Sequence, residues 1–211
     1  MGKEKGKMGK TLLDGARIQQ VIDFHGHSCP GLAIGIRAAE IGLREIGRAS
    51  TDEEVVAIVE TDMCGVDAIQ VLMGCTFGKG NLVHLDYGKN AFSFYRRSDG
   101  KGIRVVTRPH VFNQPEDEIV RLRKKMVLEG LTSKEKERVR ALLQAKVQEI
   151  MDADLEDLFE VRPAPGPIPA KALILDGLVC DECGERTMET RIRRFMGQNL
   201  CPPCFEKKMR G

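Results

Sequence analysis

The chain has 211 residues, 42% of them hydrophobic and 30% charged, which is the composition of a globular protein of one or two domains. Its formal net charge of +2 gives no general electrostatic reason to expect binding to nucleic acid or to membranes. There is no apolar run near the ~20 residues that span a bilayer and no signal-peptide pattern. We therefore expect a cytoplasmic protein whose seven cysteines bind metal or react rather than form disulfides.

The first ten residues include four lysines and predict a flexible tail, 1–10. Apolar residues then recur at helical spacing after Pro30, which suits the first turn of a helix. A β-branched run at 54–60 predicts a buried strand, and 64–74 predicts a second helix that ends at a glycine. Three further strands are expected at 81–86, 91–97 and 102–107, with an Asp-Gly hairpin signal before the last. This order predicts an α+β fold, an α-β-α-β-β-β core whose mixed sheet is covered by helices on one face.

The chain turns helical beyond Pro109, and Thr132 with Glu135 predicts a capping box ahead of a long helix. These charged helices fit a lid, a spacer or a dimerisation arm, and the apolar stripe from Val139 to Met151 favours packing against a partner.

Four prolines within seven residues, at 163–169, predict a stiff, extended connector that is neither helix nor central strand. We therefore expect a core with its helical extension at 11–160, a proline-rich linker at 161–172 and a small cysteine domain at 173–211.

The cysteine domain contains C-x2-C-x17-C-x2-C, formed by Cys180, Cys183, Cys201 and Cys204. Two tight turns that each present a pair of thiolates suit tetrahedral zinc. The segment has few large apolar residues, so metal would have to stabilise it, and the sequence predicts a zinc finger. A redox C-x-x-C pair is the competing interpretation.

The core offers a second candidate metal site, because His25, His27 and Cys29 lie directly before one predicted helix and Cys64 lies at the start of the next. Helix N-termini stabilise thiolates, and in a mixed sheet both helices can start at one edge. We expect zinc or another transition metal there. Two histidines at alternating positions point to opposite sides of an extended segment, so a turn at Gly26 is required if both bind. If only one binds, we favour His27 and leave His25 as a supporting or acid–base group. The alternatives are a reactive thiol and a purely structural turn.

Three glycines at 74, 78 and 80 follow the second predicted helix, and they would let backbone amides approach an anion closely. Gly78 and Gly80 are therefore candidate ligand-binding positions, although a tight connecting loop explains them equally well.

The stretches "FHGHSCPGLAIGIRAA", "TDMCGVDAIQVLMGCTFGKGNL" and "LDYGKNAFSFY", followed by a four-cysteine finger, resemble the FmdE family of formylmethanofuran dehydrogenase components. The resemblance implies an intertwined homodimer and a metal-associated cleft built from His25, His27, Cys29 and Cys64. It also marks Asp67, Gln70, Cys75, Thr76, Asn81 and Lys89 as family motif positions, and we expect Cys75, Thr76, Asn81 and Lys89 to contribute to ligand binding. It suggests molybdenum or tungsten enzyme subunits as partners, or a pterin-type ligand.

Three functions remain open at this point. The first is a metal-binding accessory protein that binds a pterin-type or anionic ligand in the His/Cys cleft. The second is a stand-alone enzyme that uses zinc-bound water or a thiolate, with Cys64 and His25 as the candidate catalytic residues. The third possibility is a zinc-finger regulator that binds nucleic acid.

Overall fold

A computed structural model describes residue 11 and residues 13–47, 54–112 and 117–210. The predicted tail, 1–10, lies outside these residues. The chain divides into two compact units, one up to Lys171 and the other from Ala172 onward. Within the described residues, no helix has both the length and the apolar character needed to cross a membrane.

The first unit is built on a five-stranded mixed sheet with the order β2-β1-β3-β4-β5. Strands β1 and β2 are parallel, whereas β3, β4 and β5 continue from β1 as antiparallel neighbours. The strands are β1 (Val55–Val59), β2 (Leu82–His84), β3 (Ala91–Arg96), β4 (Gly102–Thr107) and β5 (Phe159–Pro163). The predicted α+β fold with a mixed sheet is confirmed.

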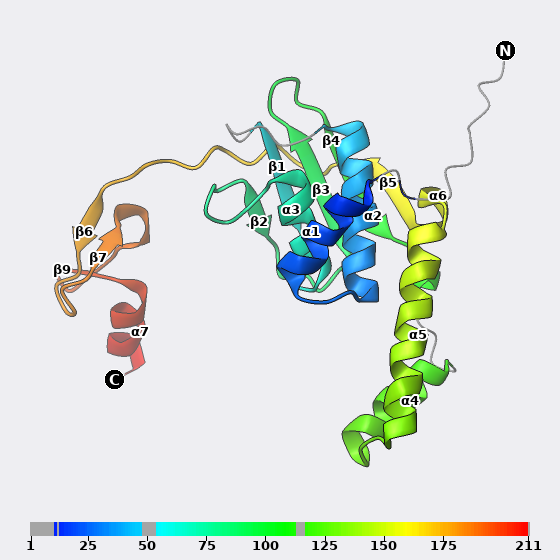
Figure 1. The fold of residues 1–211 in the computed structure, drawn as a ribbon. Helices are drawn as coiled ribbons and strands as arrows, with labels where there is room; N and C mark the ends of the chain where they lie inside the picture. Colours follow the sequence, from blue (N-terminus) through cyan, green and yellow to red (C-terminus); the bar gives the residue numbers. More distant parts are fainter. Residues whose placement is uncertain (1–10, 12, 48–53, 113–116, 211) are drawn as a thin grey trace. The chain divides into compact units, whose positions relative to one another are not determined.

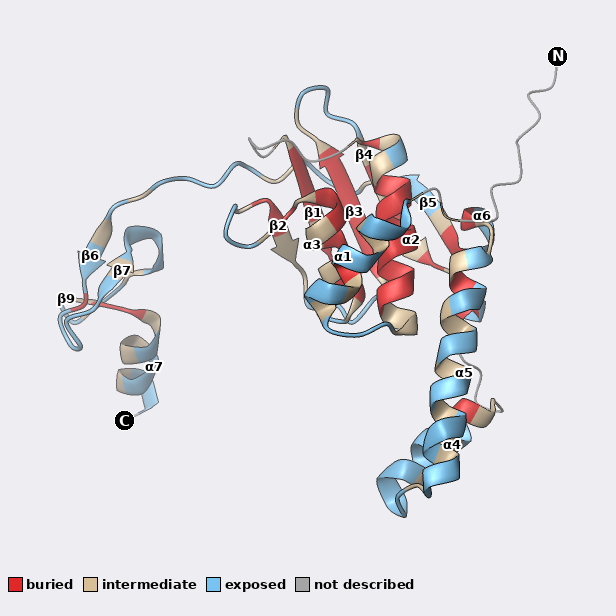
Figure 2. Cartoon of the chain, viewed as in Figure 1, coloured by how far each residue is buried: buried red, intermediate tan, exposed pale blue. Residues whose placement is uncertain are grey.

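Three helices cover one face of this sheet: α1 (Gly15–His25), α2 (Pro30–Glu45) and α3 (Gly65–Met73) (Figure 1). Helix α2 is the most deeply buried of the three, as the red colour of most of its ribbon shows (Figure 2). It is buried because it packs on α3 and on the sheet. The core combines Ile36, Ile41, Ile69 and Leu72 of these helices with Phe92 and Phe94 of β3. Burial of large apolar side chains of this kind is the main stabilising contribution to such a fold.

Helices α2 and α3 approach each other closely at a pair of glycines. A Cβ atom added to Gly35 of α2 would lie 2.3 Å from the carbonyl oxygen of Gly65, the first residue of α3. No side chain fits into that space, so glycine at position 35 is what lets the two helix backbones meet.

A helical arm lies between β4 and β5 in the chain. It consists of α4 (Glu118–Leu128) and α5 (Ser133–Asp152), with the short α6 (Leu155–Leu158) after it. The predicted capping box is confirmed, since Thr132 and Glu135 cap the start of α5 reciprocally. The C-terminal part of the stripe on α5, with Val147, Ile150 and Met151, packs against the core of the same chain. That part of the stripe therefore needs no second copy of the chain to cover it.

The proline-rich segment begins as β5 and then runs along the first unit. The hydroxyl of Tyr95 donates a hydrogen bond of 2.6 Å to the carbonyl of Pro165, and Arg97 donates to the carbonyl of Pro169. Lys171 lies 3.8 Å from the carboxylate of Glu54. Proline is tolerated at the end of β5 because this is an edge strand, and the residues expected to form a linker are pinned to the core as far as residue 171.

The second unit contains two short hairpins and a helix. The elements are β6 (Gly177–Val179), β7 (Arg186–Met188), β8 (Arg193–Phe195), β9 (Gln198–Leu200) and α7 (Pro202–Arg210). Its buried cluster is formed by Cys180, Leu200 and Cys201, with Phe195, Cys204 and Phe205 packed against it. Such a small apolar core gives little stability without a further cross-link.

Candidate functional site

The core cluster forms where α1 ends and α2 begins. His25 is the last residue of α1, and Gly26 caps the helix in the left-handed conformation with φ at 88°. This is the turn that both histidines require to face the same side. The ligand-type atoms of His25, His27 and Cys29 all lie within 4.8 Å of one another. Two imidazoles and a thiol at such distances are a donor set that suits zinc and other transition metals.

Asp67 in the first turn of α3 orients His25. Its Oδ2 atom lies 2.7 Å from Nδ1 of His25, and its Oδ1 atom accepts a hydrogen bond of 3.2 Å from Gln70. A carboxylate only accepts hydrogen bonds, so this contact places a proton on Nδ1 of His25, and in the neutral imidazole the lone pair is then on Nε2. Nε2 lies 3.9 Å from Sγ of Cys29, and it therefore faces the cluster.

The two core thiols sit at the N-termini of neighbouring helices, as the sequence predicted. Cys29 caps α2 and accepts a hydrogen bond of 3.4 Å from the amide of Leu32. Cys64 is at the cap position of α3, and both thiols line one cavity. The expectation that each helix terminus lowers the thiol pKa is wrong for Cys64. Burial raises the pKa of Cys64, and the neighbouring Cys29 raises it further.

Two cavities flank the cluster and share Met63 and Cys64. One, of about 440 Å³, is also lined by His25, Asp62, Asp67 and His84. The other, of about 410 Å³, is also lined by His27, Cys29, Phe112, Arg123 and Lys146. Both volumes are of the size that small-molecule sites occupy, and a metal held by the cluster would be reached from either side.

The loop at 74–81, which was expected to help bind a ligand, makes contacts within the core of the protein. Cys75 is fully buried, its Sγ atom lies 3.6 Å from the carbonyl of Val55, and burial raises the pKa of its thiol to about 12. Asn81 is also fully buried, and its side chain accepts from the amide of Thr76 and donates to the carbonyl of Val55. Both side chains hold the loop to the start of β1.

The other expected ligand residues of this region are not at the cluster either. Neither of the two cavities is lined by Thr76, Gly78, Gly80 or Lys89. The ammonium of Lys89 instead lies 5.5 Å from the ring centre of Tyr87. Phe77 and His84, which the sequence did not suggest, do line a cavity beside Cys64.

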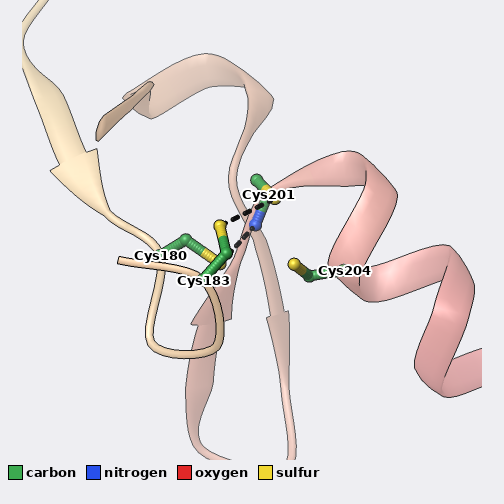
Figure 3. Close-up of side chains that lie close together, drawn as sticks. All are labelled: Cys180, Cys183, Cys201 and Cys204. Atoms are coloured by element: carbon green, nitrogen blue, oxygen red, sulfur yellow. Dashed lines mark hydrogen bonds between the residues drawn. The ribbon is translucent and has the colours of Figure 1, made fainter. Parts of the chain in front are cut away.

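The second unit holds a four-cysteine cluster (Figure 3). The sulfur atoms of Cys180, Cys183, Cys201 and Cys204 lie within 4.8 Å of one another. The amide of Cys201 donates to Sγ of Cys180 at 3.3 Å, and backbone amides of Cys183 and Cys201 lower the pKa of Cys180 to about 6. Four thiols, one of them stabilised as the thiolate, fit a metal ion that prefers tetrahedral sulfur ligands.

Comparisons with known proteins agree with this picture. A probable S-adenosyl-L-methionine-binding protein of Archaeoglobus fulgidus is 34% identical over 193 residues, which cover 86% of this chain and 50% of that protein. The chain therefore spans about half the length of this relative. The crystal structure of an FmdE-like protein of the tungsten formylmethanofuran dehydrogenase type, from Syntrophus aciditrophicus, matches with a TM-score of 0.59 and 24% identity. It covers 95% of this chain and 97% of that one, and at this identity it supports the fold alone.

The family model described as "FmdE, Molybdenum formylmethanofuran dehydrogenase operon" matches residues 24–160, which include the core cluster and strands β1 to β4. This match spans more than half of the chain and confirms the resemblance seen in the sequence. The chain belongs to the FmdE family.

Proposed function

We propose that the protein is an FmdE-type accessory protein that holds one metal ion in the core and one zinc ion in the four-cysteine cluster. In the core, His27, Cys29 and Nε2 of His25 would hold zinc or another transition metal and present it to a ligand. Cys64 lies outside the group of donors within 4.8 Å of one another, but it lines a cavity with Cys29 and would supply a further ligand. The observation that supports this proposal best is the convergence of His25, His27 and Cys29 within 4.8 Å between two cavities. A structural turn would need neither the converging donors nor the open space around them.

The bound ligand would be a small molecule of pterin or anionic type, and the partners would be subunits of a molybdenum or tungsten enzyme. The family supports this direction, since its description refers to a molybdenum formylmethanofuran dehydrogenase operon. The name of the Archaeoglobus relative makes S-adenosyl-L-methionine a further compound to test by calorimetry. We also expect a homodimer, because Met126, Val127 and Leu128 at the end of α4 are 54%, 80% and 80% exposed.

A second candidate function is catalysis by a core thiol. Asp67, His25 and Cys29 form a carboxylate–imidazole–thiol sequence, with 2.7 Å between the first two groups and 3.9 Å between the last two. In such an arrangement the imidazole can accept the thiol proton while the carboxylate stabilises the imidazolium. Metal binding and thiol catalysis would use the same atoms, so metal content decides between them.

The test is metal counting on the full-length protein and on Cys64→Ala and His27→Ala. We expect two metal ions per chain, falling to one in each variant. Cys75→Ala is the matched control, because it also removes one thiol, but a buried one that lies next to the start of β1. This variant should retain both ions. One ion in all four proteins would reject the core metal site and favour the thiol. Sedimentation that finds only a 23.5 kDa species at micromolar concentration would reject the dimer.

A further inference from the structure

The cavity on the arm side of the core cluster has a distinct electrostatic character. Among the described residues that line it, Arg123 of α4 and Lys146 of α5 are charged, and there is no aspartate or glutamate. The cavity on the other side of Cys64 shows the reverse, since Asp62 and Asp67 line it together with two histidines and no lysine or arginine. The two cavities that share Cys64 are therefore lined by side chains of opposite charge.

Apart from the two cations, the two thiols, His27 and Asn90, the side chains that line this cavity are apolar. Ile34 of α2, Leu143 and Ile150 of α5, and Val111 line the cavity between the arm and the core. The arm is fixed on this side, because Ile150 belongs to the buried core and Val147 packs against it. A ligand in this cavity would meet two cations, several apolar side chains and the two thiols.

Both cations are available to a ligand. Arg123 is exposed and has no ion pair within the part of the chain that the structure describes. The side chain of Lys146 is 19% exposed, and its ammonium lies 2.8 Å from the carboxylate of Glu149, whose side chain is 65% exposed. An ammonium group can donate three hydrogen bonds, so an anion in the cavity can share Lys146 with Glu149.

We propose that the arm-side cavity binds a small organic anion, with its carboxylate or phosphate on Arg123 and Lys146 and its other end at Cys29 and Cys64. Guanidinium groups bind both anions through paired hydrogen bonds, and the partly enclosed, apolar surroundings strengthen the attraction. The volume of about 410 Å³ suits a ligand of this size. This inference rests on the proposed function, since it identifies the ligand class and the recognition residues of the same site.

Calorimetric titration tests the proposal with octanoate, octyl phosphate and, as the oppositely charged probe, octylamine. The key variant is Arg123→Gln/Lys146→Gln. The control is Arg121→Gln/Lys136→Gln, which removes the same charge from the same two helices at exposed positions that line neither cavity. We expect at least one of the two anions to bind the wild type and the control, and to bind the key variant about tenfold or more weakly. Octylamine should bind more weakly than the anions.

The rate at which iodoacetamide alkylates Cys29 and Cys64, followed by mass spectrometry, reports whether the anion occupies this cavity. Saturating anion should slow alkylation of both thiols in the wild type and in the control. Equal affinity of the two double variants, no binding to the wild type, or binding without thiol protection would each overturn the proposal. Both measurements are made on metal-free and zinc-loaded protein. If the core binds no metal, the metal site is rejected, and the titration of the metal-free protein still shows whether the cavity binds the anion.

Discussion

The imidazole of His25 and the carboxylate of Asp67 lie 2.7 Å apart, although the two residues are 42 positions apart in the chain. The contact joins the end of α1 to the first turn of α3 and fixes which nitrogen of His25 faces Cys29. Removal of such a supporting carboxylate typically lowers metal affinity 10- to 100-fold.

We therefore expect Asp67→Asn to weaken core metal binding by about 10- to 100-fold in a competition titration with a chromophoric chelator. Asp62→Asn is the control, because Asp62 lines the same cavity but does not pair with His25. Equal affinity for the two variants would show that Asp67 does not orient a ligand.

Gly35→Ala tests whether the contact between α2 and α3 sets the geometry of the core site. The added methyl group would overlap the backbone of Gly65, so we expect the free energy of unfolding to fall by about 1–3 kcal/mol. Since the two helices carry Cys29 and Cys64, core metal affinity should fall while the four-cysteine cluster keeps its ion.

Gly15→Ala is the matched control for that substitution, because a Cβ atom there meets nothing within 4 Å. It replaces a helical glycine by alanine and should leave stability unchanged or raise it by up to about 1 kcal/mol. Chemical denaturation measures both variants, and an undisturbed Gly35→Ala protein would contradict the packing argument.

Glu60 and Arg104 give a prediction on pH. Two hydrogen bonds of 2.6 and 2.8 Å join them on the sheet, and they lower the pKa of Glu60 below its ordinary value. The carboxylate of Glu60 therefore binds a proton more tightly in the unfolded chain than in the folded protein. The stabilisation is present above the unfolded pKa and is lost as pH falls through the lower, folded pKa.

We expect Glu60→Gln to lower the free energy of unfolding by about 2 kcal/mol at pH 7, and the difference from wild type to shrink as pH falls below about 4. Glu137→Gln, at an exposed position of α5, should show little difference at any pH. Urea denaturation at several pH values provides the measurement. A difference for Glu60→Gln that does not change with pH would mean that the ion pair contributes no linked stability.

The four-cysteine unit should lose its fold when metal is removed. Its buried cluster is small, so a fragment covering 172–211 is expected to be folded with zinc and unfolded in a strong chelator, as judged by amide dispersion in NMR spectra. The fragment Cys180→Ser should be unfolded in both conditions. A fragment that keeps its dispersion in the chelator would reject the zinc-finger interpretation.

Much of the fold could be predicted because local patterns were strong. The helix after Pro30, the β-branched run of β1 and the hairpin at Asp99–Gly100 all appear where the sequence indicated. Helix α1 was not predicted, although its signals were present: Asp14 accepts from the amide of Arg17 as an N-cap, and Ile18, Val21 and Ile22 form an apolar stripe. The short length and polar composition of α1 masked them.

Strand β5 was not predicted because prolines normally exclude strands, and only the register with β4 shows that it forms a sheet edge. At the site, the spacing of His25, His27 and Cys29 was informative because it is local. The contacts of Asp67, Arg123 and Lys146 depend on how separate helices pack, and no local pattern encodes that.

The hydrogen bonds from Tyr95 and Arg97 to the carbonyls of Pro165 and Pro169 have a consequence for where the chain can be cut. A protein that ends at residue 160 would lack most of β5 and would leave the Tyr95 hydroxyl without its acceptor. We expect limited proteolysis to spare bonds between 159 and 170 and to act beyond Lys171. Truncation after residue 171 should then yield a stable fragment, whereas truncation after residue 160 should yield one that is degraded during expression.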